Sequence, residues 1–335
     1  MFFYYRLSFF STILAFLVVI IGAYTRLTDA GLGCPDWPGC YGQWIVSSSA
    51  NGENPLINPT KAWTEMTHRY LAGSLGLMIL TLTILSIQNR WTQRSIQLPL
   101  CLPIALCVLV AFQALLGMWT VTLKLLPVIV MAHLLGGLAT LSLLWILTLT
   151  VKAIVMQNRR ELSHSPFPFR ILALFSLIAL ITQLFLGGWT SANYAALACT
   201  KFPFCQSHLS VNTEFRHIRE AFRLTAAGPS KIGNPLEANE LMIVHMTHRI
   251  GALLTAMVLT VFSYCLFFQS NNTRLRMLAA ILFGLLAIQL LLGILNVIAH
   301  LPLMIAVSHN GVAALLLLVL LTLLYQVNTA PLKNL

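Results

Sequence analysis

The chain has 335 residues, of which 58% are hydrophobic and only 9% charged, and its mean hydropathy is +0.82. So few charged residues cannot cover the water-facing surface of a soluble protein, which excludes a soluble globular fold. The net charge of +11 does not indicate nucleic-acid binding, because no basic stretch is interleaved with aromatic residues. The composition predicts an all-α, polytopic membrane protein.

Eight apolar runs are long enough to cross a bilayer, for which about 20 residues are needed. They lie near residues 7–24, 64–87, 96–121, 128–151, 169–189, 241–268, 277–299 and 303–325. Basic residues gather in the short loops of one side, whereas residues 25–63 and 190–240 form two long loops on the other. The positive-inside rule then predicts that both termini lie in the cytoplasm and the long loops outside. Arg6 is the one cation before the first run, and no small-residue cleavage site follows that run, so we expect a retained helix.

An internal repeat organises the chain, since residues 22–40 align with residues 187–205 without a gap. Downstream, residues 66–69 (MTHR) recur at 246–249, residues 113–117 (QALLG) recur as 289–293 (QLLLG), and His133 corresponds to His309. Shared apolar composition would explain the recurrence of QALLG as QLLLG. It does not explain two cysteine loops that are both followed by MTHR. Four spans in each half give a parallel repeat. We therefore expect two four-helix bundles, with an N-terminal half at 1–155, a linker at 156–168 and a C-terminal half at 169–335.

Four histidines lie about two turns, on the order of 10 Å, from the outer ends of the even-numbered spans: His68, His133, His248 and His309. A single buried histidine is more often a hydrogen-bonded structural residue. Four repeat-related ones instead favour ligands, and facing histidines on neighbouring helices supply both axial ligands of an iron porphyrin. A closed zinc site needs four ligands together, so one pair in each half predicts two haem-sized sites.

The two halves differ at one position beside these histidines. Glu65 precedes His68 by three residues, on the same helix face, whereas His245 precedes His248. Glu65 is the only carboxylate within the predicted spans, and either a structural pairing or catalysis explains it; its asymmetric placement favours catalysis. Three arginines near the outer helix ends are candidate contacts for haem propionates, although such arginines more commonly extend to the membrane surface: Arg26, Arg69 and Arg249.

Four cysteines form two pairs in the outer loops, Cys34 with Cys40 and Cys199 with Cys205. Thiols outside the cytoplasm usually oxidise, so we expect two disulfides. A structural cross-link is the simpler role for both pairs. The first pair, which precedes the helix of Glu65, is also a candidate for redox exchange.

Together these residues resemble the haem A synthases of bacterial and mitochondrial respiratory membranes. The resemblance covers nearly the whole chain and is carried by the EMTHR motif at 65–69, its HMTHR partner at 245–249, the CPDWPGC loop at 34–40, His133 and His309. It implies an oxidoreductase that converts the C8 methyl group of haem O to a formyl group, with water as the oxygen source, to give haem A for terminal oxidases.

The resemblance also implies roles for the site residues. His248 and His309 would bind a haem b cofactor (iron protoporphyrin IX), while His68, His133 and Glu65 would serve the haem O substrate. Haem O synthase and oxidase assembly factors are the partners it suggests, beside membrane lipid, and a homo-oligomer is compatible with it. It implies no role for His245.

Two other classes of protein compete with this interpretation. A two-haem electron-transfer protein similar to the membrane cytochromes b would also use four histidines, but it would place its haems near opposite membrane faces. Here all four histidines lie near one face. A transporter with parallel repeats predicts broken helices and polar residues at the membrane midplane, and the sequence has few of these.

Overall fold

The computed structural model describes residues 1–45, 58–92, 97–156, 160–162, 167–201, 205, 215–224 and 236–331. Eight of its helices are long and apolar enough to cross a membrane. They are α1 (Phe2–Leu27), α2 (Pro59–Trp91), α3 (Cys101–Thr122), α4 (Pro127–Val155), α5 (Phe167–Ala192), α7 (Ala238–Gln269), α8 (Thr273–Ile298) and α9 (Leu303–Asn328). The prediction of a helical membrane protein with eight spans is confirmed.

The helices begin where the sequence supplies capping groups. The Asn58 side chain accepts a backbone hydrogen bond at the start of α2, and Pro127 opens α4, where its missing N–H costs nothing. Glu237 and Glu240 form a capping box that starts α7 three residues before the predicted span. Glu240 is therefore a second carboxylate within a spanning helix, so the expectation that Glu65 is the only one was wrong. Its carboxylate serves the helix cap.

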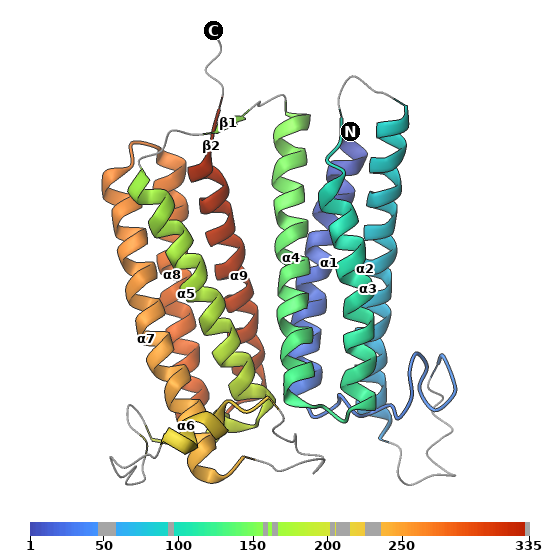
Figure 1. The fold of residues 1–335 in the computed structure, drawn as a ribbon, viewed down its shortest axis with the longest axis vertical. Helices are drawn as coiled ribbons and strands as arrows, with labels where there is room; N and C mark the ends of the chain where they lie inside the picture. The colour runs from blue at the N-terminus through green and yellow to red at the C-terminus, as the bar shows by residue number, and fades with distance from the viewer. Residues whose placement is uncertain are drawn as a thin grey trace.

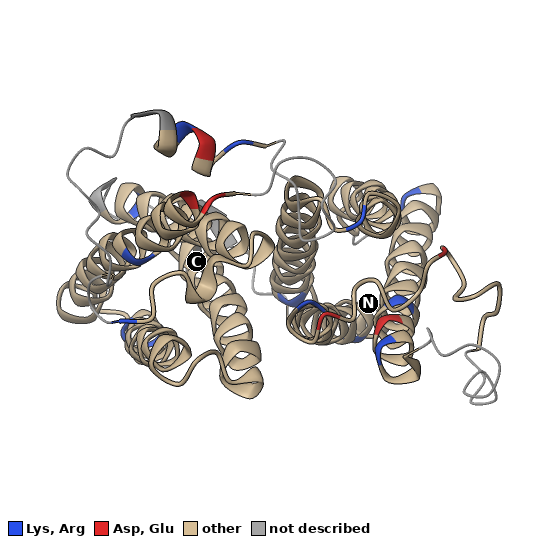
Figure 2. Ribbon diagram, turned by 90° about the horizontal axis from the view of Figure 1, so that it is seen from below, with Lys and Arg blue, Asp and Glu red and all other residues tan. Residues whose placement is uncertain are grey.

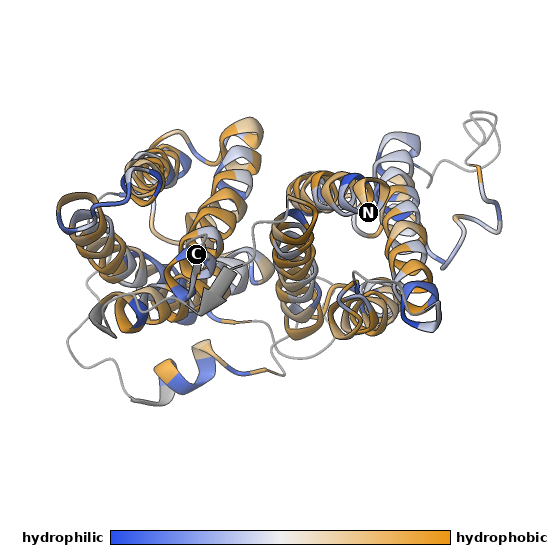
Figure 3. Ribbon diagram, turned by 90° about the horizontal axis from the view of Figure 1, so that it is seen from above, coloured by the Kyte–Doolittle hydropathy of each residue, from blue (hydrophilic) through white to orange (hydrophobic). Residues whose placement is uncertain are grey.

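The spanning helices form two rings of four (Figures 2 and 3). In the first ring α1 contacts α2 and α4, and α3 contacts the same two helices, so α2 and α4 lie diagonally opposite each other. In the second ring α5 and α8 each contact α7 and α9, which are likewise diagonal. The rings meet where α1 and α4 pack against α9 and α4 packs against α5. The division into two functional domains stays a prediction.

The two ends of the molecule differ in what they carry (Figure 1). One end, here called the cysteine side, holds both cysteine loops, the turn η2 (Ala195–Leu197) and the short helix α6 (Phe215–Ala221). The other end, the terminal side, holds the chain termini and a two-stranded antiparallel sheet that the sequence did not predict. In it β1 (Arg160–Leu162) pairs with β2 (Thr329–Pro331), with Arg160 opposite Pro331. Most of the predicted linker, including 157–159 and 163–166, lies outside the described residues.

The main hydrophobic core occupies the terminal side of the helices. In α2 it begins at Leu75 and in α4 at Leu138, in both cases beyond the histidine of that helix. The same holds in the second ring, where the core begins at Leu259 in α7 and at Ala314 in α9. All four histidines therefore lie at one level, between this core and the loops of the cysteine side.

Candidate functional site

A pair of histidines meets inside the first ring of helices. The ring centroids of His68 on α2 and His133 on α4 are 6.4 Å apart, and the ring planes are inclined at 81°. With histidine–metal bonds of about 2.1 Å, one ion between two imidazoles sets the centroids roughly 6.5 Å apart. We had expected these two histidines on neighbouring helices, but they come from diagonal ones. Their separation suits a shared metal ion.

The second ring has the corresponding pair, His248 on α7 and His309 on α9, which are close enough to interact electrostatically. All four imidazoles are half-buried. The Nδ1 atoms of His68, His133 and His309 are buried and have no side-chain hydrogen-bond partner among the described residues, and each ring is approached by the backbone of the preceding spanning helix. Because buried imidazoles are normally hydrogen-bonded, these donor sets fit an iron porphyrin held by two imidazoles in each ring.

Each of these imidazoles lies against a glycine of the preceding spanning helix. A Cβ atom added at any of these glycines would lie 3.0 to 3.5 Å from Cε1 of the histidine: Gly22 against His68, Gly117 against His133, Gly187 against His248, and Gly293 against His309. A side chain there would press on the ring, so the glycines fix how closely the helices approach the histidines. The repeat alignment contains all four glycines, but sequence reasoning assigned them no part in the site.

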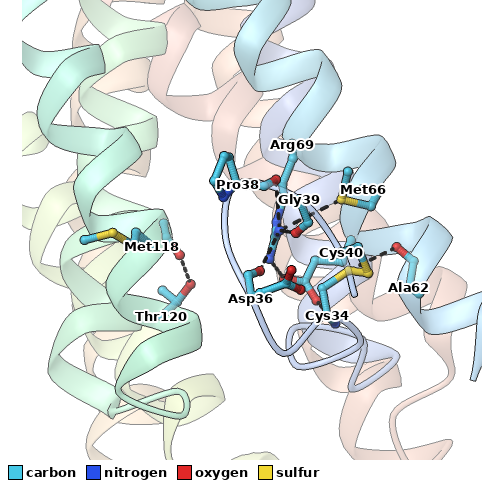
Figure 4. A network of polar contacts seen from close by, with 12 residues as sticks. Cys34, Asp36, Pro38, Gly39, Cys40, Ala62, Met66, Arg69, Met118 and Thr120 are labelled. Carbon is cyan, nitrogen blue, oxygen red and sulfur yellow. Dashed lines mark hydrogen bonds and ion pairs between the residues drawn. A yellow bond between two sulfur atoms is a disulfide. The ribbon is translucent and has the colours of Figure 1, made fainter. Parts of the chain in front are cut away.

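A network of polar contacts around Arg69 holds the first cysteine loop on α2 (Figure 4). Glu65 belongs to this network. Its buried carboxylate pairs with Arg69, with 2.5 Å between Oε1 and Nη2, and accepts the backbone N–H of Cys34 at 2.9 Å. The Sγ atoms of Cys34 and Cys40 are 2.01 Å apart, the distance of a disulfide. Arg69 Nη1 in turn donates to three loop carbonyls, those of Asp36, Pro38 and Gly39. Glu65 and Arg69 thus act as a latch on this loop.

His245 takes the place of Glu65 in the second half. Its Nδ1 lies 3.3 Å from the backbone N of Cys199, and its Nε2 lies 3.2 Å from Nε of Arg249. Arg249 donates to the Cys199 carbonyl at 2.6 Å and to a second loop carbonyl, that of Lys201. A neutral imidazole accepts at only one nitrogen, so His245 accepts either from the Cys199 N–H or from Arg249, whereas the Glu65 carboxylate accepts from both of its partners. The latch is therefore common to both halves, and only the first half builds it with a carboxylate.

The second loop is also closed by a cysteine pair, with 2.16 Å between the Sγ atoms of Cys199 and Cys205. Both predicted pairs are thus at disulfide distance. Three other cysteines carry free thiols: Cys101, Cys107 and Cys265.

Arg26 joins the two halves on the cysteine side. It donates to the Ser191 carbonyl at 2.6 Å, lies 3.5 Å from the Asp29 carboxylate, and stacks its guanidinium 3.9 Å from the centre of the Tyr194 ring. The Tyr194 hydroxyl donates to Asp29 at 2.9 Å. Burial raises the pKa of Tyr194, an effect that Arg26 opposes.

The repeat relates Asp29 to Tyr194 and Arg26 to Ser191, so this contact joins equivalent helix ends. All three arginines proposed as propionate contacts have protein partners: Arg26 in this contact, and Arg69 and Arg249 in the loop latches. Their contact with propionates stays a prediction.

The fold and the site define a helical membrane protein with eight spanning helices and two pairs of buried histidines. Residues 5–321 match the model of the cytochrome oxidase assembly protein family (COX15-CtaA). Since this match covers nearly the whole chain, the chain belongs to that family.

Several proteins named heme A synthase are similar to this chain. The one from Shewanella oneidensis is 47% identical over 92% of both chains. The one from Mesorhizobium japonicum is 26% identical over 90% of this chain and 84% of its own length. The one from Alkalihalophilus pseudofirmus is 28% identical over 61% of this chain and 66% of its own.

Proposed function

We propose that this chain is a haem A synthase, an oxidoreductase that converts the C8 methyl group of haem O to a formyl group. Its family and the 47% identical relative named heme A synthase support this activity. The observation that carries the proposal is the asymmetry of the site, because Glu65 stands one helical turn before His68 in the first half, whereas His245 holds the corresponding place before His248 in the second. One pair then serves chemistry and the other serves electron transfer.

The second half is the proposed cofactor half, in which His248 and His309 would hold haem b. When bound, this cofactor supplies one-electron transfer. Ligation and burial are the requirements for such a role, and two half-buried histidines that face each other inside this half support it. His245, which stands where the first half has its carboxylate, is engaged with the loop and Arg249.

The first half is the proposed substrate half, in which His68 and His133 would orient haem O. In each round the carbon would give up a proton and two electrons, which would pass one at a time through the second half to an electron acceptor outside the protein. Water then adds to the resulting cation and a second proton leaves. The first round yields an alcohol, and the second yields a hydrate that loses water to give the aldehyde. Glu65 lies one helical turn from His68, where a carboxylate would take up protons or stabilise the positive charge on the carbon.

A two-haem electron-transfer protein is the alternative, and the level of the histidines argues against it. Electron transfer across a bilayer needs haems near both faces, whereas all four histidines lie between the core and the cysteine side. We further propose that the protein lies in a bacterial plasma membrane with its cysteine side outside, and that haem O synthase and oxidase assembly factors are its partners.

The test is conversion of haem O by the purified protein in water enriched in oxygen-18, followed by mass analysis of the extracted haems. The proposal expects an alcohol that carries the heavy isotope, and then haem A. The alcohol is the diagnostic species, because an aldehyde also exchanges its oxygen with water. An alcohol labelled only from oxygen-18 gas would contradict water as the source, and no conversion by haem-loaded protein would contradict the activity.

A further inference from the structure

A further spacing repeats within this chain on the helices that precede the histidines: a glutamine stands four residues before the glycine that touches the imidazole. This holds at three of the four places, at Gln113 before Gly117, Gln183 before Gly187 and Gln289 before Gly293. Residues four apart share one helix face, so each glutamine lies beside the same histidine as its glycine. The fourth place, before Gly22, has Val18.

Gln183 makes the closest of these contacts. Its Nε2 lies 2.9 Å from His248 Nδ1 and donates to the His248 carbonyl at 3.1 Å. Gly251 leaves room for this carboxamide, since a Cβ atom there would lie 2.5 Å from Gln183 Oε1. That oxygen is buried and has no partner among the described residues. Metal binding at Nε2 of His248 requires a proton on Nδ1. A half-turn of the carboxamide then lets Oε1 accept from that Nδ1–H, in exchange for the hydrogen bond to the His248 carbonyl.

The first half lacks this arrangement at His68. Val18 has no hydrogen-bonding side chain, and Leu71 stands where the second half has its glycine. The imidazole of His68 is approached by the backbone of Val18, and its buried Nδ1 has no side-chain partner among the residues that the structure describes. Gln113 and Gln289 occupy repeat-related positions beside the remaining two histidines, so they do not distinguish the halves.

We propose that Gln183 is a positioning residue whose side chain fixes the imidazole of His248 and so retains the haem of the second half, whereas the side chain of Val18 offers His68 no such bond, so that the haem of the first half exchanges. This inference rests on the proposed function. A resident cofactor must stay through many turnovers, and a substrate must leave as product. Hydrogen bonds to metal-bound histidines contribute about 10- to 100-fold in metal affinity, enough to separate the two behaviours.

The test measures how fast haem b leaves the purified protein for an excess of apomyoglobin, followed by absorbance. Gln183→Val copies the residue of the first half and should speed the loss about 10- to 100-fold. Thr182→Val is the matched control, because the Thr182 hydroxyl is exposed and donates to the Ile178 carbonyl of its own helix. It should leave the rate unchanged.

The reciprocal variant carries Val18→Gln with Leu71→Gly, and it should slow the loss of haem O from the first half. Equal rates of haem b loss from Gln183→Val and Thr182→Val, with unchanged low-spin electron paramagnetic resonance signals, would overturn the inference and leave the proposed function standing. Retention of haem b by His248→Ala would instead overturn the assignment of the cofactor half. The two failures are therefore distinguishable.

Discussion

Replacing Glu65 with histidine copies the latch of the second half into the first, and so separates the structural role of Glu65 from the chemical one. The carboxylate pairs with Arg69 and accepts the Cys34 N–H. Histidine keeps one acceptor for these donors, as His245 does. The exchange of charge-assisted hydrogen bonds for a neutral one should lower the free energy of unfolding by about 1–2 kcal/mol. Removal of the whole group by Glu65→Ala should cost about 3–5 kcal/mol, because it leaves the buried charge of Arg69 without its counter-ion.

The loss of activity should be larger than this loss of stability suggests. If the carboxylate takes up protons or stabilises the cation, its removal lowers turnover about 10²-fold or more, equivalent to at least about 2.7 kcal/mol of activation free energy. The assay is the ratio of haem A to haem O in membranes with matched amounts of protein. We expect Glu65→His, and likewise Glu65→Gln, to accumulate haem O or the alcohol while the haem b of the second half remains.

The control is His245→Glu, which places a carboxylate in the latch of the other half. This variant should still make haem A, because the substrate half is unchanged. Near-normal haem A from Glu65→His would refute the reasoning and assign Glu65 to the loop latch alone.

Four further predictions follow from the packing and chemistry of the site. Replacing either His248 or His309 with alanine should abolish a low-spin bis-histidine haem b spectrum, and unchanged haem b content in both variants would refute their assignment. Gly187→Ala should lower haem b content, since its Cβ would lie 3.0 Å from the His248 ring, whereas Gly284→Ala meets nothing within 4 Å and should have no effect. The four loop cysteines should resist alkylation until reduced, and free thiols at all four would contradict the pairing. Tyr194 should ionise above the ordinary tyrosine value of about 10. The stability that its protonated form contributes is present below that pH and is lost as the pH rises through the raised pKa. Difference absorbance against Tyr194→Phe measures this ionisation, and ionisation at or below the ordinary value would contradict the prediction.

The sequence predicted the spans and the level of the histidines because both depend on one-dimensional properties. Every lipid-facing helix must be apolar whatever its neighbours are, and depth follows from counting residues from the helix end. The predicted span began after the true start of α7, because Glu240 is polar and was left outside the apolar run. Glu240 caps the helix and so forms part of its first turn. Pattern alone therefore predicted the spans and the level of the histidines, and its errors in the spans lie at the helix ends.

The contacts within the site depend on which helices oppose each other, and spacing does not determine that. The sequence suggested that His68 and His133 lie on neighbouring helices, whereas they lie on diagonal ones. The shared latch of Glu65 and His245 was visible as a repeat position, but its partners are backbone groups of folded loops. The contact of Arg26 at the junction of the two halves was not predicted, because it has no sequence signature.

The central claim is that the two histidine pairs hold different haems, and identification of the extracted haems by mass tests it most directly. The wild-type protein, purified from cells that make haem O, should contain haem B together with haem O or haem A. Variants of the His68 and His133 pair should lose haem O and haem A and keep haem B, while variants of the His248 and His309 pair should lose haem B. Haem B alone at both pairs would contradict the account and would favour a two-haem electron-transfer protein.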